Sequence, residues 1–226
     1  MSLNIVEKIN GKVKIRNVLM SVSDKTGLDM LVPGLAGINP DIKIYSTGGT
    51  HKAIADLLGA KAAKNLVSVS DYTGQPEMQG GLVKTLDFKI YLGLLSETYN
   101  DAHVADLKRT KAVAIDMVVV NLYPFVKTVA KPGVKPEEAR TNIDIGGPCM
   151  VRASAKNFLR VASVTDPADY VRILDELKNA GGMLSFETRL ELAQKAFRHT
   201  AAYDKAISEY LGARPYAEVA ACYKLV

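Results

Sequence analysis

Residues 18–35, VLMSVSDKTGLDMLVPGL, contain an apolar run, a polar loop and an amphipathic segment in immediate succession. The same order returns over residues 42–58, where an apolar run at 42–45 precedes an amphipathic segment at 50–58. Short apolar runs that alternate with helical patterns predict a parallel sheet covered by helices. We therefore expect an α/β fold with three layers, α/β/α, around a mainly parallel central sheet.

Other apolar runs extend this pattern along the chain. They predict strands at residues 66–69, 90–95, 117–120 and 161–164. The continuous run Met117-Val118-Val119-Val120 is typical of an inner strand with both faces buried.

Helical patterns fill the intervals between these runs. We expect helices at 102–110, 137–140, 147–157 and 166–179, and Ser185 is expected to cap a long C-terminal helix. At the N-terminus, Asn10-Gly11 before the alternating Val13 and Ile15 predicts a small β-hairpin over residues 5–15.

The composition limits the kinds of partner that we expect. A net charge of +5 fits an anionic ligand, but the cations are spread along the chain and Trp is absent, so we do not expect nucleic-acid binding. With only three His, and with Cys149 and Cys222 far apart, neither a metal site nor a disulfide framework is indicated. No apolar run reaches the ~20 residues of a membrane span, and we expect a cytoplasmic protein.

Two polar loops suggest a site for phosphate. Ser21-Val22-Ser23-Asp24-Lys25-Thr26-Gly27 and Ser46-Thr47-Gly48-Gly49-Thr50 each follow a predicted strand. Each loop alone is equally explained as a helix cap or a turn. Together they bring hydroxyls, free amides and a lysine to two strand ends of one sheet, which suits a phosphate dianion.

A third segment adds an acid to these loops. Asn142-Ile143-Asp144-Ile145-Gly146-Gly147 reads as the end of an apolar strand that leads into a helix, with Arg152 and Lys156 further along. The glycines allow backbone N–H groups to approach an anion at the helix start. Arg152 and Lys156 are four residues apart, and two neighbouring cations favour a nearby anion, although Lys156 is equally explained as a helix surface lysine.

The order and content of these segments resemble the IMP cyclohydrolase domain of bifunctional purine-biosynthesis proteins, over residues 16–211. The resemblance rests on residues 21–27, 46–50, Val-Lys-Thr-Leu (83–86), Asn-Leu-Tyr-Pro-Phe (121–125), 143–147, Arg-Ala-Ser-Ala-Lys-Asn (152–157) and Phe-Arg-His-Thr-Ala-Ala-Tyr-Asp (197–204). It implies a methylglyoxal-synthase-like fold with a long C-terminal helix. It also implies ring closure of 5-formamidoimidazole-4-carboxamide ribonucleotide to IMP, with no cofactor, in a homodimer.

The resemblance also implies roles for individual residues. It makes Lys84, Tyr123, Asp144 and Lys156 catalytic, although Tyr123 before Pro124 is equally explained by ring packing. The residues expected to bind substrate are Ser21, Ser23, Lys25, Thr26, Ser46, Thr47, Gly48, Gly49, Thr50, Thr85, Asn121, Gly146 and Gly147.

The chain departs from the usual pattern of this family beside Lys84. Leu82, Asp87 and Phe88 stand where the family has Arg, His and Pro, and Phe158 replaces a His. An acid near Lys84 would disfavour phosphate, so an inactive phosphate-binding module of the same fold is the alternative. Residues 1–15 and 212–226 are expected to lie outside the domain, the latter towards a formyltransferase domain or partner.

Overall fold

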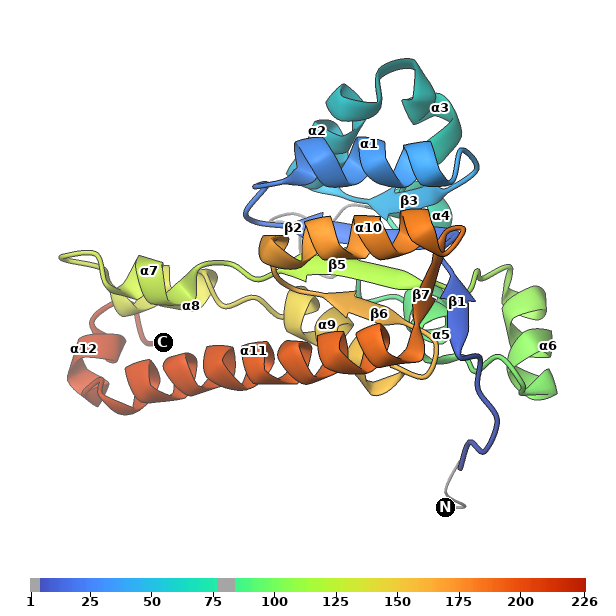
Figure 1. Ribbon diagram of the computed structural model, residues 1–226. Helices are drawn as coiled ribbons and strands as arrows, with labels where there is room; N and C mark the ends of the chain where they lie inside the picture. The colour runs from blue at the N-terminus through green and yellow to red at the C-terminus, as the bar shows by residue number, and fades with distance from the viewer. Residues whose placement is uncertain (1–4, 77–83) are drawn as a thin grey trace.

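The computed structural model describes residues 5–76 and 84–226. A five-stranded parallel sheet lies at its centre, in the order β4-β3-β2-β5-β6 (Figure 1). The strands are β2 (Asn17–Val22), β3 (Lys43–Ser46), β4 (Leu66–Ser68), β5 (Met117–Asn121) and β6 (Ala162–Val164). The predicted parallel sheet is therefore confirmed, with β2 as its middle strand.

Two hydrophobic cores, one on each face of the sheet, explain why the strands are so apolar. Met117 and Val119 of β5 belong to one core, whereas Val118 and Val120 belong to the other. Successive side chains of a strand point to opposite faces, so a strand covered on both sides needs a continuous apolar run.

Helices cover both faces of the sheet (Figure 1). The helices α1 (Leu28–Ile38), α2 (Gly48–Leu58) and α10 (Tyr170–Asn179) pack on the first core. The second core is covered by α5 (Phe88–Leu95), α9 (Gly146–Lys156) and part of α11 (Phe186–Gly212). The remaining helical segments are η1 (Gly59–Lys61), α3 (Ala62–Asn65), α4 (Val69–Thr73), α6 (Asp101–Thr110) and η3 (Pro167–Asp169).

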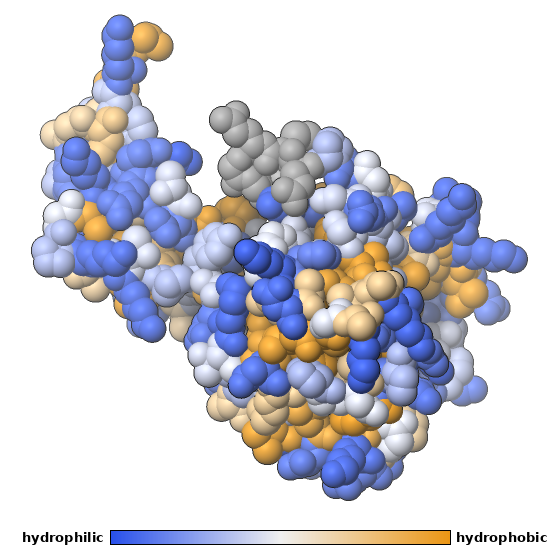
Figure 2. All heavy atoms as spheres, turned by 90° about the horizontal axis from the view of Figure 1, so that it is seen from above, coloured by the Kyte–Doolittle hydropathy of each residue, from blue (hydrophilic) through white to orange (hydrophobic). Residues whose placement is uncertain are grey.

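The long helix α11 extends beyond the sheet. Ser185 caps it as predicted, because the Ser185 hydroxyl accepts a hydrogen bond from the Thr188 N–H. At its far end lie α7 (Phe125–Val129), α8 (Pro136–Thr141) and α12 (Tyr216–Ala220), which together we call the distal lobe (Figure 1). Seen from above, the surface is hollowed between the distal lobe and the body of the domain (Figure 2).

The structure differs from the prediction at residues 90–95 and at the N-terminal hairpin. Residues 90–95 form helix α5 instead of a strand, because Asp87 caps the segment by accepting the Lys89 N–H at 2.8 Å. Gly93 packs so closely that an added Cβ would lie 2.4 Å from the Val113 oxygen. The N-terminal hairpin is also absent, since neither Asn10 nor Gly11 has the positive φ that its two-residue turn requires.

The alternation after Gly11 nevertheless belongs to a strand. The strand β1 (Lys12–Lys14) pairs antiparallel with β7 (Met183–Ser185), which lies far along the chain. Val13 and Ile15 are buried, as their spacing predicts. Residues 12–15 are thus part of the packed fold. Within residues 5–76 and 84–226, no helix is both long and apolar enough to cross a membrane.

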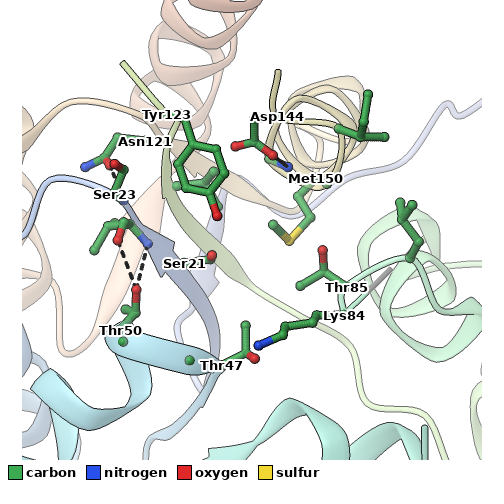
Figure 3. Close-up of a pocket in the computed structure, with 18 of the residues that line it drawn as sticks. Ser21, Ser23, Thr47, Thr50, Lys84, Thr85, Asn121, Tyr123, Asp144 and Met150 are labelled. Carbon is green, nitrogen blue, oxygen red and sulfur yellow. Dashed lines mark hydrogen bonds between the residues drawn. The ribbon is translucent and has the colours of Figure 1, made fainter. Parts of the chain in front are cut away.

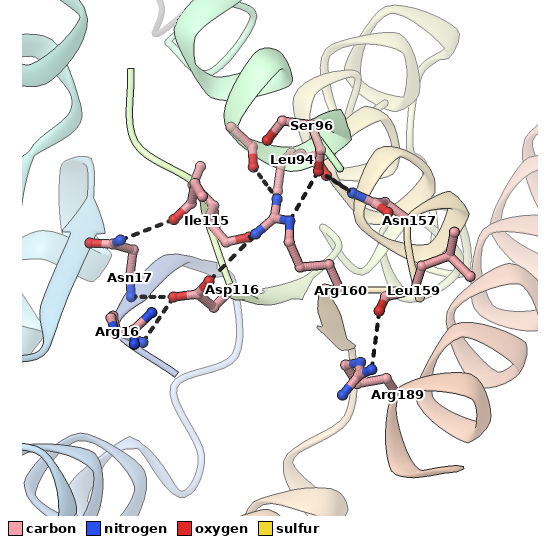
Figure 4. A network of polar contacts seen from close by, with 12 residues as sticks. Arg16, Asn17, Leu94, Ser96, Ile115, Asp116, Asn157, Leu159, Arg160 and Arg189 are labelled. Atoms are coloured by element: carbon pink, nitrogen blue, oxygen red, sulfur yellow. Dashed lines mark hydrogen bonds and ion pairs between the residues drawn. The ribbon is translucent and has the colours of Figure 1, made fainter. Parts of the chain in front are cut away.

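A buried polar network lies beside the second core, at the amino ends of the strands (Figure 4). The Arg160 guanidinium donates to the carbonyls of Ser96 and Ile115 at 3.0 and 2.9 Å, and it lies 3.4 Å from the Asp116 carboxylate. Asp116 in turn accepts the Arg16 and Asn17 N–H groups. This network joins the loop after α5 to the starts of β2, β5 and β6.

Replacing Arg160 with Met should therefore destabilise the fold by about 3–5 kcal/mol, because the Asp116 carboxylate stays buried without its cation. Urea unfolding measures this change. The matched control is Arg109→Met, since the Arg109 side chain is 75% exposed in its ion pair with Asp106, and it should change stability by no more than about 0.5 kcal/mol. Equal effects of the two substitutions would contradict this reading of the network.

Candidate active site

A cavity of about 620 Å³ lies at the carboxyl ends of β2, β3 and β5, between the N-termini of α2 and α9 (Figure 3). Ligands of open α/β sheets bind at this edge of the sheet. Most of the residues expected to bind or transform substrate line the cavity. They are Ser21, Ser23, Lys25, Thr47, Gly48, Gly49, Thr50, Lys84, Thr85, Asn121, Tyr123, Asp144, Gly146 and Gly147.

One end of the cavity carries groups that suit an anion. Two lysines converge on the N-terminus of α2: a Cβ added to Gly49 would lie 3.9 Å from Lys25 Nζ, and one added to Gly48 would lie 3.9 Å from Lys84 Nζ. The Thr47 hydroxyl oxygen is buried and accepts or donates no hydrogen bond among the described residues. Free N–H groups, the helix dipole and two cations together suit a phosphate group.

The loop after β2 is held in place by two side chains. Asn121 Oδ1 accepts the N–H groups of Ser23 and Asp24 at 2.7 and 2.8 Å, and its Nδ2 donates to the Asp24 carbonyl at 2.8 Å. The Thr50 hydroxyl accepts the Val22 N–H and donates to the Val22 carbonyl. The resemblance implies that Asn121 binds the base or its amide, which stays a prediction; Asn121 lines the cavity, and its amide also positions the loop.

The other end of the cavity carries the acid. Asp144 lies in the coil between α8 and α9, so the strand expected before it is wrong. Its Oδ1 accepts the Gly147 N–H at 2.9 Å, at the start of α9. A Cβ on Gly147 would lie 2.4 Å from Asp144 Oδ2, so only glycine allows this approach.

The surroundings of Asp144 change its acidity. Burial raises the pKa of the Asp144 carboxyl above its ordinary value, and hydrogen bonds from the N–H groups of Gly147 and Tyr123 offset part of that rise. The Tyr123 hydroxyl points into the cavity (Figure 3). Asp144 lies beside Tyr123, just before the start of α9. A raised pKa brings this carboxylate closer to the range of an effective general base at neutral pH.

Three of the predicted site residues lie outside the cavity lining. The Ser46 hydroxyl donates to the Met20 carbonyl at 2.7 Å, and the Thr26 hydroxyl donates to Asp24 Oδ1 at 2.6 Å. Lys156 is exposed at the last position of α9, about 15 Å along the helix from Gly146. Arg152 lies over the Phe197 ring at 5.6 Å, so these two cations do not meet Asp144 within one chain.

The departures from the family pattern have structural explanations. Asp87 is buried as the cap of α5 and does not line the cavity. The Phe158 ring packs on Phe186, with centroids 5.9 Å apart. Phe88 is the first, exposed residue of α5, and Leu82 lies outside the described residues. Neither Asp87 nor Phe158 therefore places an altered group against the ligand.

Several residues that line the cavity were not predicted from the sequence. Leu86, Thr141, Ile143, Ile145 and Met150 line the cavity beside the polar groups. The sulfur of Met150 points into the cavity opposite Tyr123 (Figure 3). The apolar side chains among them, in a turn, a coil or a helix, carry no signal in the sequence that distinguishes a cavity wall from a core. Among the described residues, no group of three His, Cys, Asp or Glu side chains could hold a metal ion.

The fold and the cavity define an α/β domain with a polar cavity, lined in part by Lys25 and Lys84, at the carboxyl ends of its strands. The model of the MGS-like domain matches residues 32–149, and that of the AICARFT/IMPCHase bienzyme matches residues 154–225. The chain belongs to the MGS-like domain family. The fold expected from the resemblance is thereby confirmed.

Comparisons with individual proteins agree with the resemblance. The chain is 46% identical over 197 residues to the bifunctional purine biosynthesis protein PurH of Ruminiclostridium cellulolyticum and 49% identical to that of Neisseria gonorrhoeae. These alignments cover 87% of this chain and 37% and 36% of the relatives, so the chain spans little more than a third of their length. A crystal structure of ForH matches with a TM-score of 0.76 at 32% identity, covering 87% of this chain and 97% of that chain.

The raised pKa of Asp144 predicts how the stability of the protein depends on pH. A carboxyl that binds its proton more tightly in the folded state loses stability as pH rises through its folded pKa. Asp144→Asn should therefore unfold at a higher temperature than the unchanged protein at neutral pH, and this advantage should vanish below pH 3.8, the ordinary aspartate value. Thermal unfolding at both pH values measures it.

Asp24 provides the control, because the Thr26 hydroxyl and N–H lower the pKa of its carboxyl. Its contribution to stability is present above the ordinary aspartate pKa and is lost on acidification. Asp24→Asn should not raise the unfolding temperature at neutral pH. If Asp144→Asn also fails to raise it, the environment assigned to Asp144 is wrong.

Proposed function

We propose that this chain is an IMP cyclohydrolase, which closes the purine ring of 5-formamidoimidazole-4-carboxamide ribonucleotide and releases water. The observation that carries the proposal is the cavity itself, with two lysines at the start of α2 and a half-buried acid, Asp144, just before α9. The similarity to proteins named for purine biosynthesis, together with the match to the AICARFT/IMPCHase model, supports this reaction.

The substrate's phosphate would lie at the N-terminus of α2, between Lys25 and Lys84. The Thr47 hydroxyl, which has no partner among the described residues, would donate to a phosphate oxygen. The base would then extend towards Tyr123, Asp144 and Met150, which line the opposite part of the cavity. Lys84 points towards Thr47 (Figure 3), so we assign it to the anion and not to the formyl oxygen.

Ring closure requires a base for the carboxamide. An amide nitrogen is a poor nucleophile, so a group in the site must remove its proton as it attacks the formyl carbon. We assign this role to Asp144, with Tyr123 orienting the amide. A new C–N bond forms as the amide proton passes to Asp144, and the formyl oxygen takes up a proton to become a hydroxyl. The C–O bond then breaks, the hydroxyl leaves as water with a second proton, and the formamido nitrogen loses its own proton as it forms a double bond to the former formyl carbon.

The developing oxyanion needs hydrogen-bond donors. Thr85 is buried, and its hydroxyl faces Gly146, where an added Cβ would lie only 2.8 Å away. We therefore propose Thr85 and the N-terminus of α9 as the donors. The distance of Lys156 from the cavity does not support its role as the stabilising cation within one chain.

The source of the substrate and the assembly are also proposed from relatives. The relatives are bifunctional proteins longer than this chain, and we propose that a formyltransferase domain or partner supplies the formylated substrate. The family resemblance further suggests a homodimer in the cytoplasm.

The proposed reaction is tested by the ultraviolet change on cyclisation, alongside thermal stabilisation of the protein by IMP. We expect both signals. Stabilisation by IMP without turnover would identify an inactive nucleotide-binding module instead. Strongly salt-dependent binding to nucleic acid, with indifference to IMP, would replace the proposal by a nucleic-acid-binding function.

The anion site can be tested with a matched pair of lysines. Lys25→Met should weaken IMP binding by roughly tenfold or more, because a charge-assisted hydrogen bond contributes about 1.5–3 kcal/mol. Lys52→Met is the control, since Lys52 is exposed on α2 and does not line the cavity. Isothermal titration calorimetry measures both affinities. Equal affinities of the two variants for IMP would show that the phosphate does not bind beside Lys25.

The base is tested by turnover. Asp144→Asn should lower kcat roughly 10²- to 10⁴-fold, the usual contribution of general-base catalysis, while IMP binding persists. The pH profile of the unchanged protein should lose activity on acidification at a pH above 3.8, because burial raises the pKa of Asp144. Normal turnover of Asp144→Asn would show that another group takes the proton.

A further inference from the structure

The coil that carries Asp144 is held by one hydroxyl from a distant helix. The Asp144 N–H donates to the Tyr203 hydroxyl oxygen at 2.8 Å, and that hydroxyl donates to the Asn142 carbonyl at 3.4 Å. Tyr203 lies on α11, 59 residues along the chain from Asp144. A single side chain therefore fixes the backbone on both sides of Ile143.

Tyr203 is itself firmly placed. Its side chain is only 8% exposed, and its ring meets the Phe125 ring edge-on, with centroids 6.3 Å apart. Phe125 is the first residue of α7, and its N–H donates to the Tyr123 carbonyl at 2.8 Å. Tyr203 thus touches the two segments that carry Tyr123 and Asp144.

Next to Asp144, the Ile143 N–H donates to the Arg140 carbonyl at 3.1 Å, whereas the Asp144 N–H itself is held by Tyr203. No strand includes residues 142–145, and the side chain is oriented by the Gly147 N–H at the start of α9. Loss of the Tyr203 hydroxyl would leave the Asp144 N–H without its acceptor and free the coil to turn. A misplacement of about 1 Å in a reacting group can cost on the order of 10²-fold in rate.

We infer that Tyr203 is a positioning residue for ring closure, whose hydroxyl holds the Asp144 coil while its ring holds the Tyr123 segment. The inference rests on the proposed cyclohydrolase function. Tyr203 does not line the cavity and does not touch the substrate. Its effect is transmitted through the direction of the Asp144 carboxylate.

The same helix offers a matched control. Tyr210 is two turns further along α11, is equally buried at 8% exposure, and meets Phe125 edge-on at 5.7 Å. Its hydroxyl, however, has no hydrogen-bond partner in the described part of the chain. Tyr210→Phe therefore removes a hydroxyl from the same environment without touching the Asp144 coil.

The experiment compares Tyr203→Phe and Tyr210→Phe in the complete chain. We expect Tyr203→Phe to lower kcat roughly 10- to 100-fold, with little change in KM because the anion site is at the other end of the cavity. It should also move the acidic limb of the pH profile. Tyr210→Phe should leave both unchanged. If the two variants have the same kcat and profile, the inference is overturned while the proposed function stands.

A second measurement does not depend on turnover. The Asp144 carboxyl is titrated by NMR in both variants, with circular dichroism to show that each is folded. Tyr203→Phe should shift the titration of Asp144, and Tyr210→Phe should not. If the unchanged protein has no cyclohydrolase activity, the proposed function fails, and the carboxyl titration still decides whether Tyr203 positions Asp144.

Discussion

The parallel pairing of β2 with β5 sets Val22 opposite Asn121 at the carboxyl edge of the sheet, and the cavity is arranged around that pair. The Asn121 amide fixes the loop after β2, and the Thr50 hydroxyl fixes Val22 to the start of α2. Both anion-facing segments are therefore held by side chains of neighbouring strands and helices. The chain beyond β5 continues through Tyr123 into α7 and α8 of the distal lobe and returns to the sheet as α9. The acid thus arrives opposite the anion site.

The sequence was most informative where burial is complete. The run Met117–Val120 and the segment at 18–22 predicted inner strands because both faces of those strands pack on helices. Predictions from the sequence were wrong where tertiary contacts determine the secondary structure. The apolar segment 90–95 matched a strand, but the Asp87 cap and the close contact of Gly93 with Val113 select a helix. Val13 and Ile15 have the correct alternation, yet their partner strand is 170 residues away, and no local pattern can identify it.

The site was predictable to a similar extent. Polar loops after strands identified the anion end, because strand ends of a parallel sheet must meet at one edge. The catalytic role of Lys156 comes from the family resemblance and stays a prediction, since the length of α9 separates Lys156 from Asp144 within one chain. The role of Asn121 in the loop depends on the hydrogen-bond partners of its amide, and the sequence does not identify them. Tyr203 lies 59 residues from the coil that it holds, and its hydroxyl was indistinguishable in the sequence from that of any other buried tyrosine.

The contact between Asp144 and Gly147 has a consequence for the evolution of the chain. Every amino acid other than glycine adds a Cβ, and here it would overlap the carboxylate and the Leu122 side chain. Even alanine at this position would push the Asp144 carboxylate away from the start of the helix. Substitutions at this position and at Asp144 would have to occur together. The start of α9 is thus restricted in the residues it accepts, whereas the exposed face of the same helix is not.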